Sequence, residues 1–348
     1  MRIDMRKFIS LFMCLIFALA VTGCEARNTK GAKMQKYEKQ YFDVFDTVTT
    51  LTVYAESEEK ANEYFDAVYE KLLHLHKLFD PYNTYEGMDN LKTLNDRAGE
   101  KKQRSTEPEL VEMFMYGKRI YDETDGAINI AMGATLELWH KYRDDALENG
   151  NIAVPTKEEL EVTRQFDDIS AVEAVPTTNS AIITEEGVSV NLGCIAKGYA
   201  TDRAIKILKD MGCDSALVNL GGNVSCYRGN AKDGPWRIGV QDANDPENII
   251  DVVETDSGSL VSSGDYQRYY ECDGKRYHHI IDPETLMPAA INKGTTVVCG
   301  EDIACIDADM LSTALFILPR DKADALALKY NVKQVYYTDK DGNAELLK

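Results

Sequence analysis

A carboxylate and a hydroxyl four residues apart are the clearest chemical signal in this 348-residue sequence. Asp309 and Thr313 lie in the segment DADMLSTALF, whose apolar residues predict a helix over about 308–318. Residues four apart share one face of a helix, so both side-chain oxygens would point the same way. Such hard oxygen ligands suit Mg²⁺ that is completed by a backbone carbonyl, water and phosphate. The alternative is an ordinary polar stripe on a helix, which would also place a carboxylate and a hydroxyl four residues apart.

The segment NLGCIAKGYA, residues 191–200, predicts a tight glycine turn that opens a helix. The first turn of a helix leaves backbone N–H groups free, and these can bind an anion. Lys197 places a cation in that turn, against the helix dipole. A ligand that meets Lys197 would explain this placement. The alternative is a solvent-exposed lysine beside a structural turn.

Two further segments carry weaker signals. VNLGGN, residues 218–223, places paired glycines after a strand, where the backbone can approach a ligand or simply turn. HHIIDP, residues 278–283, places His279 at a strand end, as a general base or as a satisfied polar residue.

The sequence contains no P-loop, no GxGxxG after a strand, no HExxH and no GxSxG motif. The chemistry must therefore come from less common motifs.

The elements that would position these residues mix helices and strands without a regular βαβ repeat, so we expect the α+β class. Ser57 is expected to cap the first helix, and Thr106 with Glu109 to form a capping box at the second. No composition break divides residues 40–348, so we expect one compact domain. Apolar periodicity predicts helices over 57–79, 106–124, 157–164, 196–211, 308–318 and 321–330. Alternating patterns and turn residues predict strands over 49–55, 216–220, 236–241 and 259–262, and hairpins over 181–192, 268–281 and 333–347.

The first residues are typical of a targeting segment rather than of a fold. A positively charged start precedes the apolar stretch 8–21, which is too short for a comfortable membrane span. The stretch ends in Val-Thr-Gly-Cys, which resembles a bacterial lipobox. We expect residues 1–23 to be a signal peptide, Cys24 to carry a lipid, and residues 24–39 to be a flexible tether. This would place the domain outside the cytoplasm on the cell membrane; a plain secretory signal or an uncleaved anchor is the alternative.

The charge of the chain excludes one class of partner. With 39 Lys and Arg against 58 Asp and Glu, the formal charge is −19, which argues against nucleic acid as a partner. An anionic ligand would then need a metal ion or a local cationic spot. The six cysteines after Cys24 are widely spaced, so disulfides and buried free thiols are both compatible with export.

Taken together and in order, the segments resemble the ApbE family, the FAD:protein FMN transferases. The resemblance rests on NLGCIAKGYATDRA, ALVNLGGN, SSGDYQRYYECDGKRYHHIIDP and DADMLSTALF, with FDVFDTVTTLTVYA, FDPYNTYEGMDNLKTLN and TDGAINIAMGATLELW upstream. It spans roughly residues 42–320 and implies a T-fold-like α+β domain. It also implies cleavage of FAD with Mg²⁺, release of AMP, and attachment of FMN to a Thr or Ser of a target protein through a phosphoester. Family members are commonly exported lipoproteins, which agrees with Cys24.

The same resemblance implies roles for single residues. Mg²⁺ would be held by Asp309, Thr313 and the backbone carbonyl of Cys194, and Asp309 would thereby be catalytic. Lys197 falls where the family contacts FAD. His279 matches the histidine before the Ile-Ile-Asp-Pro run and would act as base toward the acceptor hydroxyl. The other expected FAD contacts are Phe45, Tyr82, Ala127, Ile128, Asn129, Asn191, Ile280 and Ile281.

This sequence departs from the family pattern at a few positions. Asn129 and Asn191 stand where members often have Asp, and the familiar Leu-Gly-Gly-Asp ends in Asn223 here. The expected acceptors are Rnf- or Nqr-type subunits or FMN-binding domains. An FAD pyrophosphatase and a membrane-tethered FAD-binding lipoprotein without chemistry are the alternatives.

Overall fold

The structure is a computed structural model that describes residues 34–229 and 234–347. Its largest element is an eight-stranded sheet in which all neighbouring strands are antiparallel. The strands follow one another across the sheet in the order β1 (Gln35–Val44), β2 (Thr47–Ala55), β6 (Ala216–Leu220), β7 (Asn223–Tyr227), β10 (Gly258–Gly264), β13 (Asn292–Cys299), β14 (Gln334–Asp339) and β15 (Ala344–Leu347).

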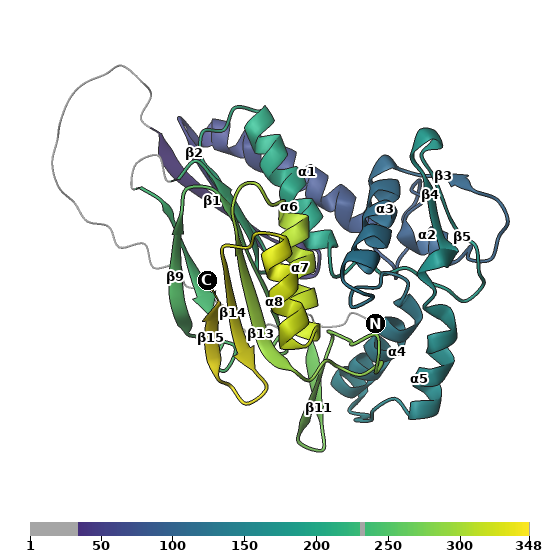
Figure 1. Cartoon of the computed structure of the whole chain (residues 1–348). Coiled ribbons are helices and arrows are strands. Elements are labelled where there is room, and N and C mark those ends of the chain that lie inside the picture. The colour runs from purple at the N-terminus through teal and green to yellow at the C-terminus, as the bar shows by residue number, and fades with distance from the viewer. Residues whose placement is uncertain (1–33, 230–233, 348) are drawn as a thin grey trace, which may run out of the picture.

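Helices cover one face of this sheet, and a two-stranded ribbon packs on the other (Figure 1). The helices are α1 (Glu58–Leu78), α6 (Ala196–Asp210) and α7 (Cys305–Ile317), with α8 (Arg320–Lys329) beside α7. The ribbon is formed by β8 (Trp236–Gln241) and β9 (Ile249–Thr255), and its apolar side chains form a separate small core with the outer face of the sheet.

A second group of elements stands beside the sheet (Figure 1). Its helices are α2 (Leu91–Asn95), α3 (Pro108–Glu123), α4 (Gly133–Asp144) and α5 (Lys157–Thr163). A small sheet has the order β3 (Arg104–Ser105), β5 (Ser180–Ile183), β4 (Val172–Val175), and a hairpin joins β11 (Tyr269–Cys272) to β12 (Lys275–His278). Short π- and 3₁₀-helical turns cover Asp145–Asn149, Arg164–Phe166, Ile169–Ala171 and Pro176–Thr178. One continuous core includes buried residues from both groups, which confirms the α+β class in a single compact unit.

The long helices form where apolar periodicity predicts them. In α1 the buried residues recur every three or four positions, and the Ser57 side chain accepts a hydrogen bond from the N–H of Lys60 at 3.1 Å. Helix α7 begins three residues earlier than expected, and its buried residues occur all around the helix because it lies between the sheet, α6 and α8. Within residues 34–229 and 234–347, no helix is both long and apolar enough to span a bilayer.

Two local predictions are wrong. The capping box at Thr106 does not form, because α3 begins at Pro108, whose ring fits the first helical position, and Glu107 makes no side-chain cap. The hairpin over 181–192 does not form either, since β5 pairs with β4 and β3 instead. The N–H and carbonyl of Val190 are bound by the side chain of Asn95 at 2.8 and 2.9 Å, so they are not available for a second strand.

The sheet also begins earlier than expected. Residues 35–39, which their polar composition assigned to a tether, pair with residues 51–55 as the first half of β1. The strand is at the edge of the sheet and mostly exposed, so it lacks the apolar alternation that marks a half-buried strand. The signal peptide, Cys24 and the rest of the tether lie outside the described residues. The six later cysteines are all unpaired.

Candidate active site

The residues expected to form the site line one cleft. They come from the β1–β2 turn, the loop after α1, the loop before α4, the segment that leads into α6, the loop after β12, and α7. The cleft residues in question are Phe45, Tyr82, Ala127, Ile128, Asn129, Asn191, Cys194, Lys197, His279, Ile280, Ile281, Asp309 and Thr313. Segments up to 268 residues apart in the sequence are therefore brought to one place.

Asp309 lies where α7 crosses the start of α6. Its side chain is almost fully buried, with 2% of the residue exposed. Oδ2 accepts a hydrogen bond from the backbone N–H of Gly198 at 2.8 Å, and Oδ1 lies 3.5 Å from Nζ of Lys197. Gly198 is the third residue of α6, so its N–H is one of the groups at the helix start that have no partner within the helix. Cys194 lies two residues before α6, and among the described contacts no hydrogen bond ends on its carbonyl oxygen.

Thr313 is one turn further along α7 and is half-buried. Its hydroxyl donates to the Asp309 carbonyl at 3.2 Å and lies 3.3 Å from Oγ of Ser263 on β10. Ser263 is closer to Ser312, at 2.8 Å. The hydroxyl oxygen of Thr313 therefore still has a lone pair with which it could bind a cation.

The oxygens at this crossing fit a magnesium ion. Within the described ranges, no group of three or more His, Cys, Asp or Glu residues is placed to hold a metal. One carboxylate, one hydroxyl and one backbone carbonyl instead form the type of incomplete oxygen site that Mg²⁺ occupies together with water and substrate phosphate. Burial and the charge of Asp309 raise the pKa of the Cys194 thiol to about 12. Mg²⁺ prefers oxygen ligands to sulfur, so Cys194 would contribute its carbonyl oxygen.

Both histidines line the cleft, but His279 is exposed whereas His278 is buried. The His278 ring is buried, and its Nε2 lies 3.0 Å from the Ala289 carbonyl. The His279 side chain is exposed to the cleft. Desolvation by the surrounding cleft walls, followed by the charge of Arg268 and then by His278, Lys197 and Arg143, holds its pKa well below the ordinary value of 6.5. The imidazole is therefore neutral at pH 7 and able to accept a proton.

Three of the cations that line the cleft act on His279, in a protein with a net charge of −19. They are Lys197, Arg143 on α4 and Arg268. They provide the local positive charge that an anionic ligand requires. No sequence motif singles out Arg143 or Arg268, because a single arginine in a mixed segment is typical of an ordinary protein surface.

The turn that contains Phe45 has a strained backbone, which hydrogen bonds with His76 and Arg268 hold in place. Phe45 and Asp46 both have left-handed backbone conformations, with φ of 55° and 50°. For residues other than glycine this costs about 1–3 kcal/mol each unless the surroundings enforce it. The N–H of Phe45 donates to Nδ1 of His76 at 3.1 Å, and Arg268 donates to the carbonyls of Phe45 and Asp46 at 3.1 and 3.3 Å. These bonds fix Phe45 at the cleft.

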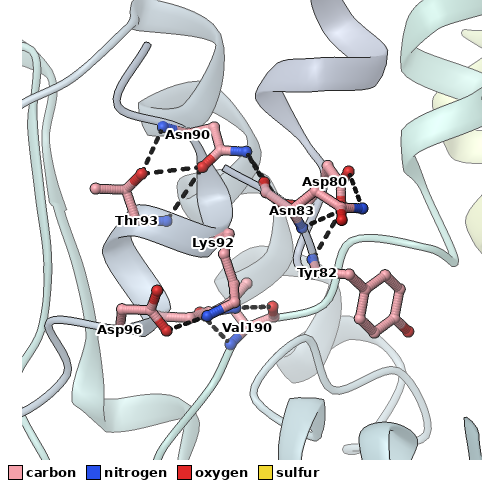
Figure 2. A network of polar contacts seen from close by, with 9 residues as sticks. Asp80, Tyr82, Asn83, Asn90, Lys92, Thr93, Asp96 and Val190 are labelled. Atoms are coloured by element: carbon pink, nitrogen blue, oxygen red, sulfur yellow. Dashed lines mark hydrogen bonds and ion pairs between the residues drawn. The ribbon is translucent and has the colours of Figure 1, made fainter. Parts of the chain in front are cut away.

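Tyr82 is presented to the cleft by a polar network (Figure 2). Asp80 accepts from the N–H groups of Tyr82 and Asn83 at 2.7 and 3.1 Å, and from the Tyr85 hydroxyl at 2.7 Å. Burial raises the pKa of Asp80, but these bonds outweigh it, so the pKa is lowered overall. Asn90, fully buried, donates to the Asn83 carbonyl at 2.8 Å. Tyr82 as a whole is 41% exposed, and its ring, which meets His140 edge-on, can also pack against a ligand.

The two asparagines expected to contact FAD behave differently. Asn129 uses its side chain inside the protein, since Nδ2 donates to the Asp167 carbonyl at 2.7 Å and Oδ1 accepts from the N–H of Ala131 at 2.9 Å. Asn191 accepts from the N–H of Gly193 at 2.9 Å and lies 3.4 Å from the Tyr82 hydroxyl. Asn191 therefore belongs to the cleft surface, whereas Asn129 shapes the loop beneath it.

The apolar and glycine positions complete the walls. Ala127, Ile128, Ile280 and Ile281 are buried among core residues and reach the cleft with one side. The paired glycines 221–222 form the turn between β6 and β7, and both have positive φ. A Cβ on the first of them would lie 2.2 Å from a Thr47 side-chain atom, so only glycine fits there.

Comparison with known proteins places the chain among flavin transferases. The sequence model of the ApbE family matches residues 45–336. The FAD:protein FMN transferase of Vibrio cholerae serotype O1 is 30% identical over 260 residues, which are 73% of each chain. That of Treponema pallidum is 28% identical, with 92% of this chain and 88% of the relative covered. The crystal structure of the ApbE protein from Thermotoga maritima superposes with a TM-score of 0.77 at 28% identity, covering 89% of this chain and 96% of the other. This chain belongs to the ApbE family.

Proposed function

We propose that this chain is an FAD:protein FMN transferase that depends on Mg²⁺. It would join FMN from FAD to a Thr or Ser hydroxyl of an acceptor protein through a phosphoester, and release AMP. The observation that carries the proposal is the position of Asp309, which lies against the start of α6 beside Lys197, with Thr313 on the same helix. That arrangement collects hard oxygen ligands and a cation in a cleft that also holds aromatic and apolar walls.

The residues at the helix crossing would bind the pyrophosphate of FAD. Asp309, Thr313 and the Cys194 carbonyl would hold Mg²⁺, which when bound supplies charge neutralisation on the pyrophosphate and on the departing AMP. Lys197 lies close enough to the Asp309 carboxylate to shift onto a phosphate oxygen that arrives there. Arg143 and Arg268 add positive charge along the cleft.

His279 would take the proton of the acceptor hydroxyl. As the hydroxyl oxygen bonds to the phosphorus of the FMN half, the bond from that phosphorus to the AMP oxygen breaks, and AMP leaves with that electron pair. The proton released from the hydroxyl passes to the neutral imidazole, which the lowered pKa keeps unprotonated at pH 7. Phe45 and Tyr82 would pack on the flavin or adenine ring, and Ile280 and Ile281 would line the nucleotide pocket.

The direct test supplies FAD, Mg²⁺ and an FMN-binding acceptor domain, and follows the acceptor by mass spectrometry and AMP by chromatography. A covalent FMN adduct with AMP in equal amount is expected. Free FMN with AMP would instead mean a pyrophosphatase, and unchanged FAD would overturn catalysis altogether. Asp309→Ala should reduce transfer by about 100-fold or more. Asp307→Asn is the matched control, because Asp307 lies on the same helix but binds Tyr116 and Arg119 of α3.

The acceptor and the location of the enzyme form a further part of the proposal. Cys24 would carry the lipid that anchors the chain to the membrane, facing away from the cytoplasm, where Rnf- or Nqr-type subunits or FMN-binding domains would be its acceptors. Cys24→Ser should move the protein from the membrane fraction to the soluble fraction without loss of transferase activity. A variant that stays in the membrane fraction would contradict the lipid anchor.

A further inference from the structure

The start of α7 is capped by a residue of α6 rather than by its own chain. Ala304, the residue before the helix, offers no side-chain acceptor. Instead, the carboxylate of Asp202 accepts hydrogen bonds from the N–H groups of Cys305 and Ile306, both at 2.9 Å. These are the first two residues of α7, whose N–H groups have no partner within the helix. A carboxylate at this position also interacts favourably with the helix dipole.

The contact between the two helices is reciprocal. Asp202 of α6 binds the first N–H groups of α7, and Asp309 of α7 binds the N–H of Gly198 in the first turn of α6. Positions 198 and 202 lie on one face of α6, and positions 305 and 309 on one face of α7. The helices are in contact here, since a Cβ on Gly198 would lie 2.5 Å from the Cys305 carbonyl oxygen. Each helix thus supplies the carboxylate that the start of the other needs.

We propose that Asp202 is a positioning residue for the magnesium site. By holding the first turn of α7, it fixes the place of Asp309 and Thr313 relative to Lys197 and the Cys194 carbonyl. This inference rests on the proposed function, because it concerns the same metal ligands. Asp202 itself does not touch the expected metal, and it does not line the cleft.

A purely structural role would give a different result, and Asp307 provides the comparison. Asp307 is also half-buried in the first turn of α7. Its carboxylate accepts from the Tyr116 hydroxyl at 2.7 Å and from Arg119 at 3.3 Å, both on α3, and from no N–H of α7 among the described contacts. Asp307→Asn therefore removes an equal charge and weakens a tertiary contact of α7 without removing the cap.

The experiment measures magnesium affinity directly. Mg²⁺ is titrated calorimetrically into the full chain with ADP present, which carries a pyrophosphate but no flavin. The Mg²⁺ dependence of AMP release from FAD is measured in parallel. Asp202→Ala should weaken Mg²⁺ binding about 10–100-fold, the range typical of residues that orient metal ligands. Saturating Mg²⁺ should restore most of kcat. Asp202→Asn keeps one acceptor oxygen and the shape of the side chain, so it should weaken Mg²⁺ binding less than Asp202→Ala does. If Asp202→Ala fails to fold, the Mg²⁺ affinity of Asp202→Asn decides the test.

The outcomes are distinct. Asp307→Asn should lower the melting temperature but leave the half-saturating Mg²⁺ concentration within about twofold of wild type, well below the tenfold scale above. Wild-type Mg²⁺ affinity in the Asp202 variants, or the same loss in Asp307→Asn, would overturn the positioning role while leaving the proposed function intact. A wild-type chain that neither binds Mg²⁺ nor releases AMP would overturn the proposed function, and this inference with it.

Discussion

The backbone N–H of Gly198 donates to Oδ2 of Asp309 at 2.8 Å, and no side chain fits between the two residues. A Cβ at position 198 would lie 2.7 Å from Cβ of Asp309 and 2.5 Å from the Cys305 carbonyl oxygen. The backbone of one helix therefore directly orients the carboxylate of the other, across 111 residues of sequence.

Gly198→Ala should separate α6 from α7 and disrupt the site. The added methyl group meets backbone atoms of α7, which cannot move independently, so a loss of about 1–3 kcal/mol in the free energy of unfolding is expected. AMP release should fall more than the folded fraction does, as measured with FAD and Mg²⁺ after denaturant titration of each variant. Gly117→Ala in α3 is the control, because its methyl group would meet only side-chain atoms of the buried Ile130 and no backbone atom of α6 or α7. Equal effects on activity in both variants would contradict this account.

Thr313→Val and Thr313→Ser should separate the hydroxyl from the shape of the side chain. Valine keeps the size but loses the oxygen, so Mg²⁺ binding should weaken by about 10-fold or more. Serine keeps the oxygen, and its Mg²⁺ dependence should stay near that of wild type. Activity is measured as AMP release over a range of Mg²⁺ concentrations. If valine and serine behaved alike, Thr313 would not be a metal ligand.

Asp80→Ala should release the loop that presents Tyr82. Four hydrogen bonds from Tyr82, Asn83 and Tyr85 end on this carboxylate, and the unpaired groups left behind should cost about 1–3 kcal/mol. We expect KM for FAD to rise several-fold with little change in kcat, because the chemical groups at Asp309 are untouched. Tyr85→Phe, which removes one of the four bonds, should have a smaller effect. A fall in kcat at constant KM would contradict a role in binding.

Asp202 should make stability fall as the pH rises. Burial and then repulsion by Asp307 raise its pKa to about 6 from 3.8, while the bonds from Ile306 and Cys305 and the charge of Arg203 oppose the rise. The folded chain thus holds a proton that the unfolded chain has already lost. The resulting stabilisation is full below about pH 4 and is lost as the pH rises through about 6. Urea unfolding at several pH values should show the wild-type advantage over Asp202→Asn shrinking across this range; a constant difference would contradict the shift.

Sequence alone predicted the helices that carry the chemistry. The periodicity in α6 and α7 is local, and the order of the motifs is specific enough to indicate the family and a set of residues that all line one cleft. Lys197 and Asp309 were each singled out, but their 3.5 Å contact was not, because nothing in either segment encodes which helix faces which.

The remaining features depend on contacts between distant segments. Strand β1 is exposed at an edge and has little apolar pattern. The predicted strand after β5 is absent because Asn95 takes the backbone groups of Val190, 95 residues away. Arg268 reaches the Phe45 carbonyl across 223 residues. Contacts between such distant segments can be identified only once the tertiary structure is known. These contacts fix the shape of the cleft.

The long reach of these bonds has a consequence for how the protein becomes active. The contacts of Asp309 with α6 close a loop of more than 100 residues, and that of Arg268 with the β1–β2 turn closes one of more than 200. Closing such loops is entropically costly, and contacts of this kind slow folding. Helical structure should therefore recover early during refolding, while the ability to cleave FAD returns last. Enzyme activity in this chain thus reports the completion of folding rather than the presence of its parts.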